Sequence, residues 1–118
     1  MRTQVLLDTG PLVAFLNRRD QHHPWAASQW REIAPPLLTS EAVLSEAVFL
    51  IEQAGGRSDT VLDLVARQVV HPVFSLNDHV EEVRKLMRKY LEVPMSLADA
   101  CLVRMSEVYS RGTVFTLD

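Results

Sequence analysis

An acidic residue interrupts the first apolar stretch of the chain, QVLLDTGPLVAFL, which begins at Gln4. Asp8 follows three apolar residues, and the next basic residue along the chain is Arg18. A buried, ionised carboxylate is costly unless it is paired with a cation, hydrogen-bonded or bound to a metal. Because the residues that follow Asp8 offer no nearby cation, its partner must come from elsewhere in the chain or from a bound ion.

Three further acidic residues stand at positions that suit the same chemistry. Glu46 lies in EAVLSEAVFLI among mostly apolar neighbours, Asp99 lies in SLADACLV, and Asp118 follows TVFTL. Converging carboxylates raise one another's pKa values unless cations neutralise them. Mg²⁺ and Mn²⁺ prefer carboxylate and water oxygens. One or two such ions would activate a water and stabilise displacement at a phosphodiester.

Short apolar runs separated by longer helical segments must position these residues. We expect strands at residues 4–7, 37–39, 69–73 and 113–116. We expect helices at residues 11–17, 24–33, 40–53, 58–68, 76–90 and 96–110. Gly55 and Gly56 end the third helix, and Ser75 and Asp78 have the spacing of a capping box at the start of the fifth.

Strands that alternate with helices predict an α/β fold, with a central parallel sheet flanked by helices. Ligands of such sheets bind beyond the carboxyl ends of the strands, where the strand order reverses. Asp8 ends the first expected strand and Asp118 lies just past the last. Asp99, in the first turn of the last helix, is expected over the same edge. The fold class therefore predicts one acidic site.

The amino-acid composition limits the classes of protein to which this chain can belong. The 118 residues suit one domain with a conventional core, and the 7% aromatic content does not indicate a stacking platform for single-stranded bases. No apolar window suits a membrane span or a signal peptide. A single cysteine, Cys101, excludes an internal disulfide and favours the cytoplasm. The net charge of −3 argues against a general basic coat for nucleic acid but not against a nuclease.

Four segments resemble the PIN-domain ribonucleases, especially the VapC-type toxins of toxin–antitoxin modules. They occur in the family's order from about Val5 to Asp118: LLDTGPLVAFLNRRDQHH, LTSEAVLSEAVFLI, SLADACLVRMSE and VFTLD. The Asp-Thr-Gly opening and the Ser-Leu-Ala-Asp-Ala segment are fairly specific in combination. The family's acidic positions match Asp8, Glu46, Asp99 and Asp118, and its polar companions match Thr9, Ser96 and Thr116.

This resemblance implies a PIN-like three-layer fold over a single domain, residues 1–118, and cleavage of RNA that depends on Mg²⁺ or Mn²⁺. Asp8 and Asp99 would be the chief metal ligands, with Glu46 and Asp118 binding directly or through water. The polar companions would hydrogen-bond the carboxylates or bound water. The resemblance further implies a homodimer and inhibition by a cognate antitoxin protein. Relatives continue past the position of Asp118, so we expect a truncated tail and a sheet that lacks the family's fifth strand.

Each acidic residue also has a purely structural interpretation. Asp8 could cap the helix that follows it, and Ser96 and Asp99 have capping-box spacing. Glu46 could lie at the rim of its helix, and Asp118 could be a solvated terminal residue. The ending at Asp118 leaves open an alternative function, a non-catalytic PIN-like module that binds RNA or protein.

Other reactive or charged residues have simpler explanations. Gly10 stands where phosphatases of the haloacid-dehalogenase type carry a second Asp, which disfavours that class. We expect His22 and His23 in a surface loop and Cys101 in the core. Arg18 and Arg19 are better placed for phosphate than the basic stripe of residues 84–89, for which a solvated face is expected. The apolar residues between 43 and 65 fit a core as well as a dimer or antitoxin surface.

Overall fold

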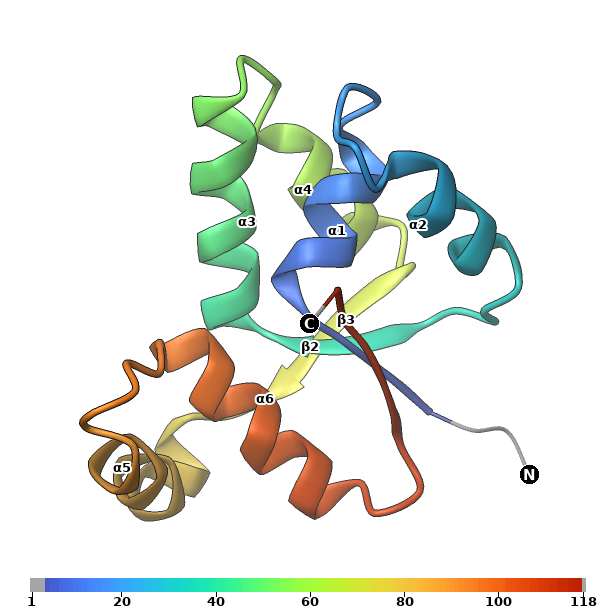
Figure 1. Cartoon of the computed structure of the whole chain (residues 1–118). Coiled ribbons are helices and arrows are strands. Elements are labelled where there is room, and N and C mark those ends of the chain that lie inside the picture. The colour runs from blue at the N-terminus through green and yellow to red at the C-terminus, as the bar shows by residue number, and fades with distance from the viewer. Residues whose placement is uncertain (1–3, 118) are drawn as a thin grey trace.

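The computed structural model describes residues 4–117, and its centre is a parallel sheet of four strands in the order β3-β2-β1-β4 (Figure 1). The strands are β1 (Val5–Leu7), β2 (Leu37–Ser40), β3 (Val70–Phe74) and β4 (Thr113–Phe115). The helices are α1 (Thr9–Leu16), α2 (His23–Arg31), α3 (Glu41–Gln53), α4 (Asp59–Ala66), the 3₁₀ turn η1 (Asn77–His79), α5 (Val80–Lys89) and α6 (Leu97–Val108). The predicted α/β class with a four-stranded parallel sheet is confirmed.

Two apolar layers arise because successive residues of a strand point to opposite faces of the sheet. Leu7 and Leu37 pack with the core under α1, α3 and α4. Leu6 and Leu38, one residue away on the same strands, pack with Met105 of α6 on the other face. The two central strands, β1 and β2, are accordingly buried at nearly every position, as expected where a parallel sheet is covered on both sides.

The chain path places a reversal of strand order beside β1. From β1 the chain moves outward through β2 to β3, with α1–α4 on one face. It then returns through α5 and α6, which cover the opposite face, to add β4 on the other side of β1 (Figure 1). Right-handed crossovers require the helices to change face when the direction changes. The carboxyl ends of β1 and β4 therefore flank the point at which ligands of such sheets bind.

One predicted cap is wrong. Ser75 and Asp78 do not form a capping box, because the Asp78 amide donates to the Ser75 backbone carbonyl at 3.2 Å. That bond closes the turn of η1, so α5 begins only at Val80 rather than at residue 76. At the end of α3 the expected glycine stop is present, with Gly55 at a φ of 82°.

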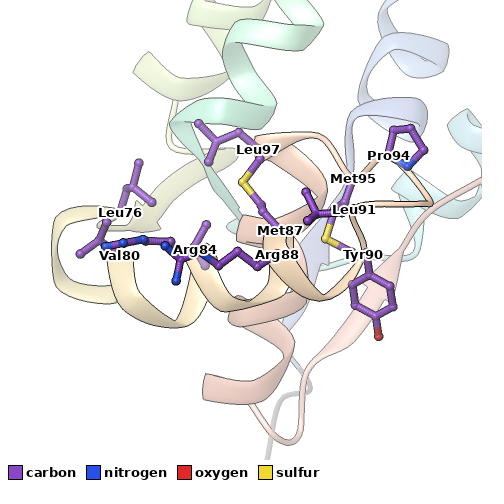
Figure 2. Close-up of a pocket in the computed structure, with 11 residues that line it drawn as sticks. Leu76, Val80, Arg84, Met87, Arg88, Tyr90, Leu91, Pro94, Met95 and Leu97 are labelled. Carbon is purple, nitrogen blue, oxygen red and sulfur yellow. The ribbon is translucent and has the colours of Figure 1, made fainter.

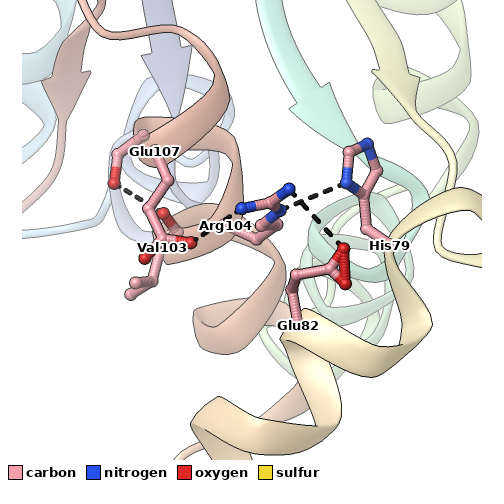
Figure 3. A network of polar contacts seen from close by, with 6 residues as sticks. His79, Glu82, Val103, Arg104 and Glu107 are labelled. Carbon is pink, nitrogen blue, oxygen red and sulfur yellow. Dashed lines mark hydrogen bonds and ion pairs between the residues drawn. The ribbon is translucent and has the colours of Figure 1, made fainter.

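Arg104 on α6 ties the α5 layer to the sheet (Figure 3). Its Nε donates to His79 Nδ1 at 3.2 Å, and its guanidinium pairs with Glu82 at 3.6 Å and Glu107 at 3.2 Å. The His79 ring stacks on Phe74 of β3 with centroids 4.9 Å apart. These contacts hold α6 in place against both α5 and β3.

None of the helices in the described part of the chain is long and apolar enough to cross a membrane.

Thr39 of β2 forms a hydrogen bond to the end of β1, and its contribution to stability can be measured. Its fully buried hydroxyl donates to the Leu7 carbonyl at 2.9 Å, directly before Asp8. We expect Thr39→Val to lower the free energy of unfolding by about 1–3 kcal/mol, because a buried acceptor loses its donor. Urea unfolding measures this difference. The control, Thr113→Val at an exposed strand position, should change stability by less than about 0.5 kcal/mol, and equal effects of the two variants would contradict the expectation.

Candidate metal centre

Asp8 is held rigidly at the carboxyl end of β1. Its backbone amide donates to the Phe115 carbonyl at 3.0 Å, which continues the pairing of β1 with β4. Its Oδ1 accepts the Thr9 amide at 2.8 Å, so Asp8 is the N-cap of α1. Its Oδ2 accepts the Thr116 hydroxyl at 2.7 Å. The capping interpretation is therefore correct, and it leaves both oxygens able to bind a further partner, since a carboxylate has about four acceptor sites.

Within the described part of the chain, no basic side chain balances the charge of Asp8. The residue is 8% exposed, and it takes part in none of the ion pairs formed by residues 4–117. The N-terminus of α1 and two hydrogen bonds stabilise the anion in part. A carboxylate that is buried at the carboxyl ends of the strands and has no cationic partner is typical of a position that binds a positively charged ligand.

Asp99 faces the same space from the opposite layer. It occupies the first turn of α6, where it forms the predicted capping box: Ser96 Oγ accepts the Asp99 amide at 3.0 Å, and Asp99 Oδ2 accepts the Ser96 amide at 3.3 Å. Asp8 and Asp99 both line a cavity of about 460 Å³, together with Thr116. The structure thus brings together two of the four acidic residues, 91 positions apart in sequence.

Glu46 lies outside this cavity, in a neighbouring one. The half-buried Glu46 of α3 lines a separate space of about 560 Å³ between α3 and α6, with Ser96 and Ala98 on its far wall. The first turn of α6 therefore separates Glu46 from the cavity of Asp8 and Asp99. Asp118 lies outside the described residues.

The donor set suits Mg²⁺ or Mn²⁺ better than softer metals. Among residues 4–117, no three Asp, Glu, His or Cys side chains form a group that could hold a metal ion by themselves. Mg²⁺ usually binds through one or two carboxylates, keeps several waters and completes its shell with substrate phosphate. Asp8 and Asp99 on one cavity provide the carboxylates of such a site, so the residues fit the ion that the acidic pattern predicts.

The three polar companions behave differently from one another. Thr116 and Ser96 hydrogen-bond the carboxylate or the backbone of Asp8 and Asp99, as described above. Thr9 supplies only its backbone amide, and its buried hydroxyl has no hydrogen-bond partner within the described chain. The bond from Thr9 to the Asp8 carboxylate is thus made by its backbone amide.

The other wall of the cavity of Asp8 and Asp99 could not be recognised from sequence patterns. Tyr90, Val93, Pro94 and Met95, from the segment between α5 and α6, line it. The same segment borders an apolar groove of about 410 Å³ along α5 (Figure 2). Pro94 signals only a loop in the sequence, so nothing local marks these residues as neighbours of the carboxylates.

The remaining candidates lie away from the carboxylates. His22 is exposed, whereas His23 is half-buried and its Nδ1 lies 2.7 Å from the Ala14 carbonyl. Cys101 is buried as expected, and burial raises the pKa of its thiol. Arg18 and Arg19 line a cavity of about 290 Å³ with Arg57, beyond the far end of α1 from Asp8.

The chain is similar to known proteins in both sequence and fold. The model of the family described as the PIN domain matches residues 5–118. A crystal structure of VapC20 from Mycobacterium tuberculosis, described as a toxin that cleaves the sarcin-ricin loop, superposes with a TM-score of 0.87. The match covers 98% of this chain and 90% of that one at 21% sequence identity, and shows a common fold. Curated protein sequences give no match.

The charge of Asp8 can be tested through stability. In the presence of a chelator, we expect Asp8→Asn to leave the free energy of unfolding equal to that of the wild type or higher. Asn retains the cap of α1 while it removes a buried charge that has no cation. Asp8→Ala should be less stable than Asp8→Asn by about 1 kcal/mol, because it loses the cap. A large loss in Asp8→Asn, measured by thermal unfolding, would mean that the chain itself neutralises the carboxylate.

Proposed function

This chain belongs to the PIN-domain family, and from that membership we propose that it is a metal-dependent endoribonuclease that cleaves RNA phosphodiesters. The observation that carries the proposal is the buried, ion-unpaired carboxylate of Asp8 facing Asp99 in one cavity. That cavity lies where the strand order reverses, the usual place for a ligand in this class of sheet.

The proposed roles follow from how each side chain is held. Asp8 and Asp99 would bind Mg²⁺ or Mn²⁺, which when bound supplies a water of lowered pKa and neutralises charge on the phosphate. The Thr116 hydroxyl and the Thr9 amide orient Asp8, and the Ser96 amide orients Asp99. Such orienting contacts tune metal ligands and are worth about 10–100-fold in affinity or activity.

Glu46 and Asp118 complete the proposed catalytic set in a different way. Glu46 lines the adjoining cavity beside Ser96, so we assign it to a contact through water rather than to direct metal binding. Asp118 follows β4 in sequence, two residues after Thr116, and its proposed role remains that of a metal ligand.

We further propose that the protein is the toxin of a type II toxin–antitoxin pair in the cytoplasm. The support is membership of the PIN-domain family and the fold shared with VapC20, which is described as a toxin. Expression of the chain should then arrest growth, and a cognate antitoxin protein should relieve the arrest. A small reading frame that overlaps the start of the coding sequence would identify that antitoxin.

The nuclease proposal predicts that substitutions of Asp8 and of Asp99 lower the rate of RNA cleavage, whereas substitution of a control acid does not. We expect Asp8→Asn and Asp99→Asn each to lower the rate of RNA cleavage with Mg²⁺ or Mn²⁺ by about 100-fold or more, the range for a group that acts in the reaction. Asp63→Asn, at an exposed acid paired with Arg67 on α4, should retain full activity. Gel assays with labelled RNA measure all three rates.

Titration with Mn²⁺ separates the nuclease from the alternative, a non-catalytic PIN-like module. The nuclease should bind Mn²⁺ in calorimetry and gain thermal stability from it, by about 2.7 kcal/mol at a hundredfold excess over Kd, and Asp8→Asn should gain less. Absence of Mn²⁺ binding, with RNA affinity unchanged by chelator, would favour the module.

We also propose a homodimer in which a second copy covers the apolar groove along α5. The groove is lined by Val80, Met87 and Leu91, among others (Figure 2). Tyr90 and Met95 line both this groove and the cavity of Asp8 and Asp99. Leu91 is 78% exposed, and Val93, two residues further along the chain and lining the cavity of Asp8 and Asp99, is 69% exposed. Apolar side chains this exposed are typical of a surface that another protein covers.

Sedimentation or light scattering tests this surface. We expect Leu91→Ser to raise the dimer dissociation constant at least tenfold, because burying a leucine contributes about 1.5–3 kcal/mol. Leu62→Ser, at a leucine of 59% exposure on α4, should leave the dimer intact. Dissociation by Leu62→Ser instead would move the interface to the face of α3 and α4.

A further inference from the structure

An exposed aromatic side chain stands one helical turn beyond Glu46. Phe49 of α3 is 58% exposed, although every other Phe of the chain is buried or half-buried. Ala42, Ser45, Glu46 and Phe49 all line the cavity of about 560 Å³ between α3 and α6. Their spacing of three, four and seven residues puts them on one face of the helix. Phe49 thus faces an open cavity rather than the core.

The opposite wall of this cavity belongs to the turn that carries Asp99. Ser96, Leu97 and Ala98 of that turn line the cavity, and Leu97 is 42% exposed. Ser96 is also the capping-box partner of Asp99, whose side chain lines the metal-site cavity. A ligand between Phe49 and Leu97 would therefore lie one helical turn from the proposed cleavage site.

We propose that this cavity receives a nucleobase of the RNA strand, stacked on the Phe49 ring, next to the phosphodiester that is cut. The inference rests on the proposed nuclease function and specifies how its substrate is held. Sequence-tolerant binding of single-stranded RNA uses aromatic rings as stacking surfaces. Leu97 supplies an apolar surface across the cavity, and the hydroxyls of Ser45 and Ser96 supply partners for the polar edges of a base.

The charge of the cavity favours a base over a phosphate. Its lining contains one acid, Glu46, and no Lys or Arg, so it would repel a phosphate group. A different cavity, lined by Arg18, Arg19 and Arg57, has the positive charge that would attract a phosphate group. The lining also differs from that of the groove along α5, where Arg84 and Arg88 border a mostly apolar surface that is better suited to a protein.

The test measures binding of a fluorescein-labelled single-stranded RNA of mixed sequence by anisotropy, with Asp8→Asn present in every chain to prevent cleavage. We expect Phe49→Ala to weaken binding by roughly 5–150-fold, the range for loss of one base stack. Phe49→Leu should lose most of this affinity too, because it keeps apolar bulk without a π-face, whereas Phe49→Trp should retain it. The matched control is Leu62→Ala, which removes an apolar side chain of equal exposure and should bind RNA normally.

Several outcomes would overturn the inference. These are unchanged binding by Phe49→Ala, full binding by Phe49→Leu, or no RNA binding by the parent chain. Loss of a dimer or another protein complex in Phe49→Ala, with RNA affinity intact, would assign the side chain to a protein interface instead. Thermal unfolding checks that each variant is folded, as expected for an exposed position.

The two proposals can fail separately. A chain that binds RNA through Phe49 but cleaves none with either metal would retain the base site and lose the nuclease. A chain that cleaves RNA with unchanged affinity in Phe49→Ala would retain the nuclease and lose the base site.

Discussion

The hydrogen bond from the Thr116 hydroxyl to Asp8 joins residues 108 positions apart, and the candidate site depends on it. It forms because β4 is added beside β1, so the residue after each strand emerges at the same edge of the sheet. Together with the Thr9 amide it fixes both oxygens of a carboxylate that forms no ion pair with a basic side chain of residues 4–117. A rigid, buried anion of this kind is costly for folding alone, and that cost is the physical basis of the proposed cation site.

The two faces of the sheet contribute different parts of the site. The α1–α4 layer supplies the helix that Asp8 caps and the face of α3 that carries Glu46 and Phe49. The α5–α6 layer supplies Asp99 and the apolar wall between the two helices. Arg104, bonded to His79 and paired with Glu82, keeps the second layer in register with the sheet. Asp99 is thereby held over β1 although it belongs to a helix of the opposite layer.

The first turn of α6 divides the functional surface into two cavities with different chemistry. On one side, Asp8 and Asp99 present carboxylates with oxygen ligands for a hard cation. On the other side, Phe49 and Leu97 present apolar surfaces with serine hydroxyls around them. A single strand of RNA offers both kinds of group, phosphate and base, at neighbouring positions. The proposed function therefore accounts for Glu46 lining the cavity beside that of Asp8 and Asp99.

Much of this architecture could be predicted from the sequence because local patterns control it. Apolar runs specify strands by their period, the capping box of Ser96 and Asp99 specifies where α6 begins, and Gly55 specifies where α3 ends. The same local reasoning failed at Ser75, where a 3₁₀ turn used the amide that a cap would need.

The sequence by itself determined the class of fold and which residues carry charge suited to metal chemistry. Only the tertiary structure decided which of these acidic residues line the same cavity. Strand order placed Asp8 beside Thr116, and the packing of α6 put Asp99 on the cavity of Asp8 while it kept Glu46 in the next one. It also left Phe49 facing a cavity, although the low aromatic content pointed away from base stacking. Distances between side chains depend on how separate elements pack, and no local pattern records that.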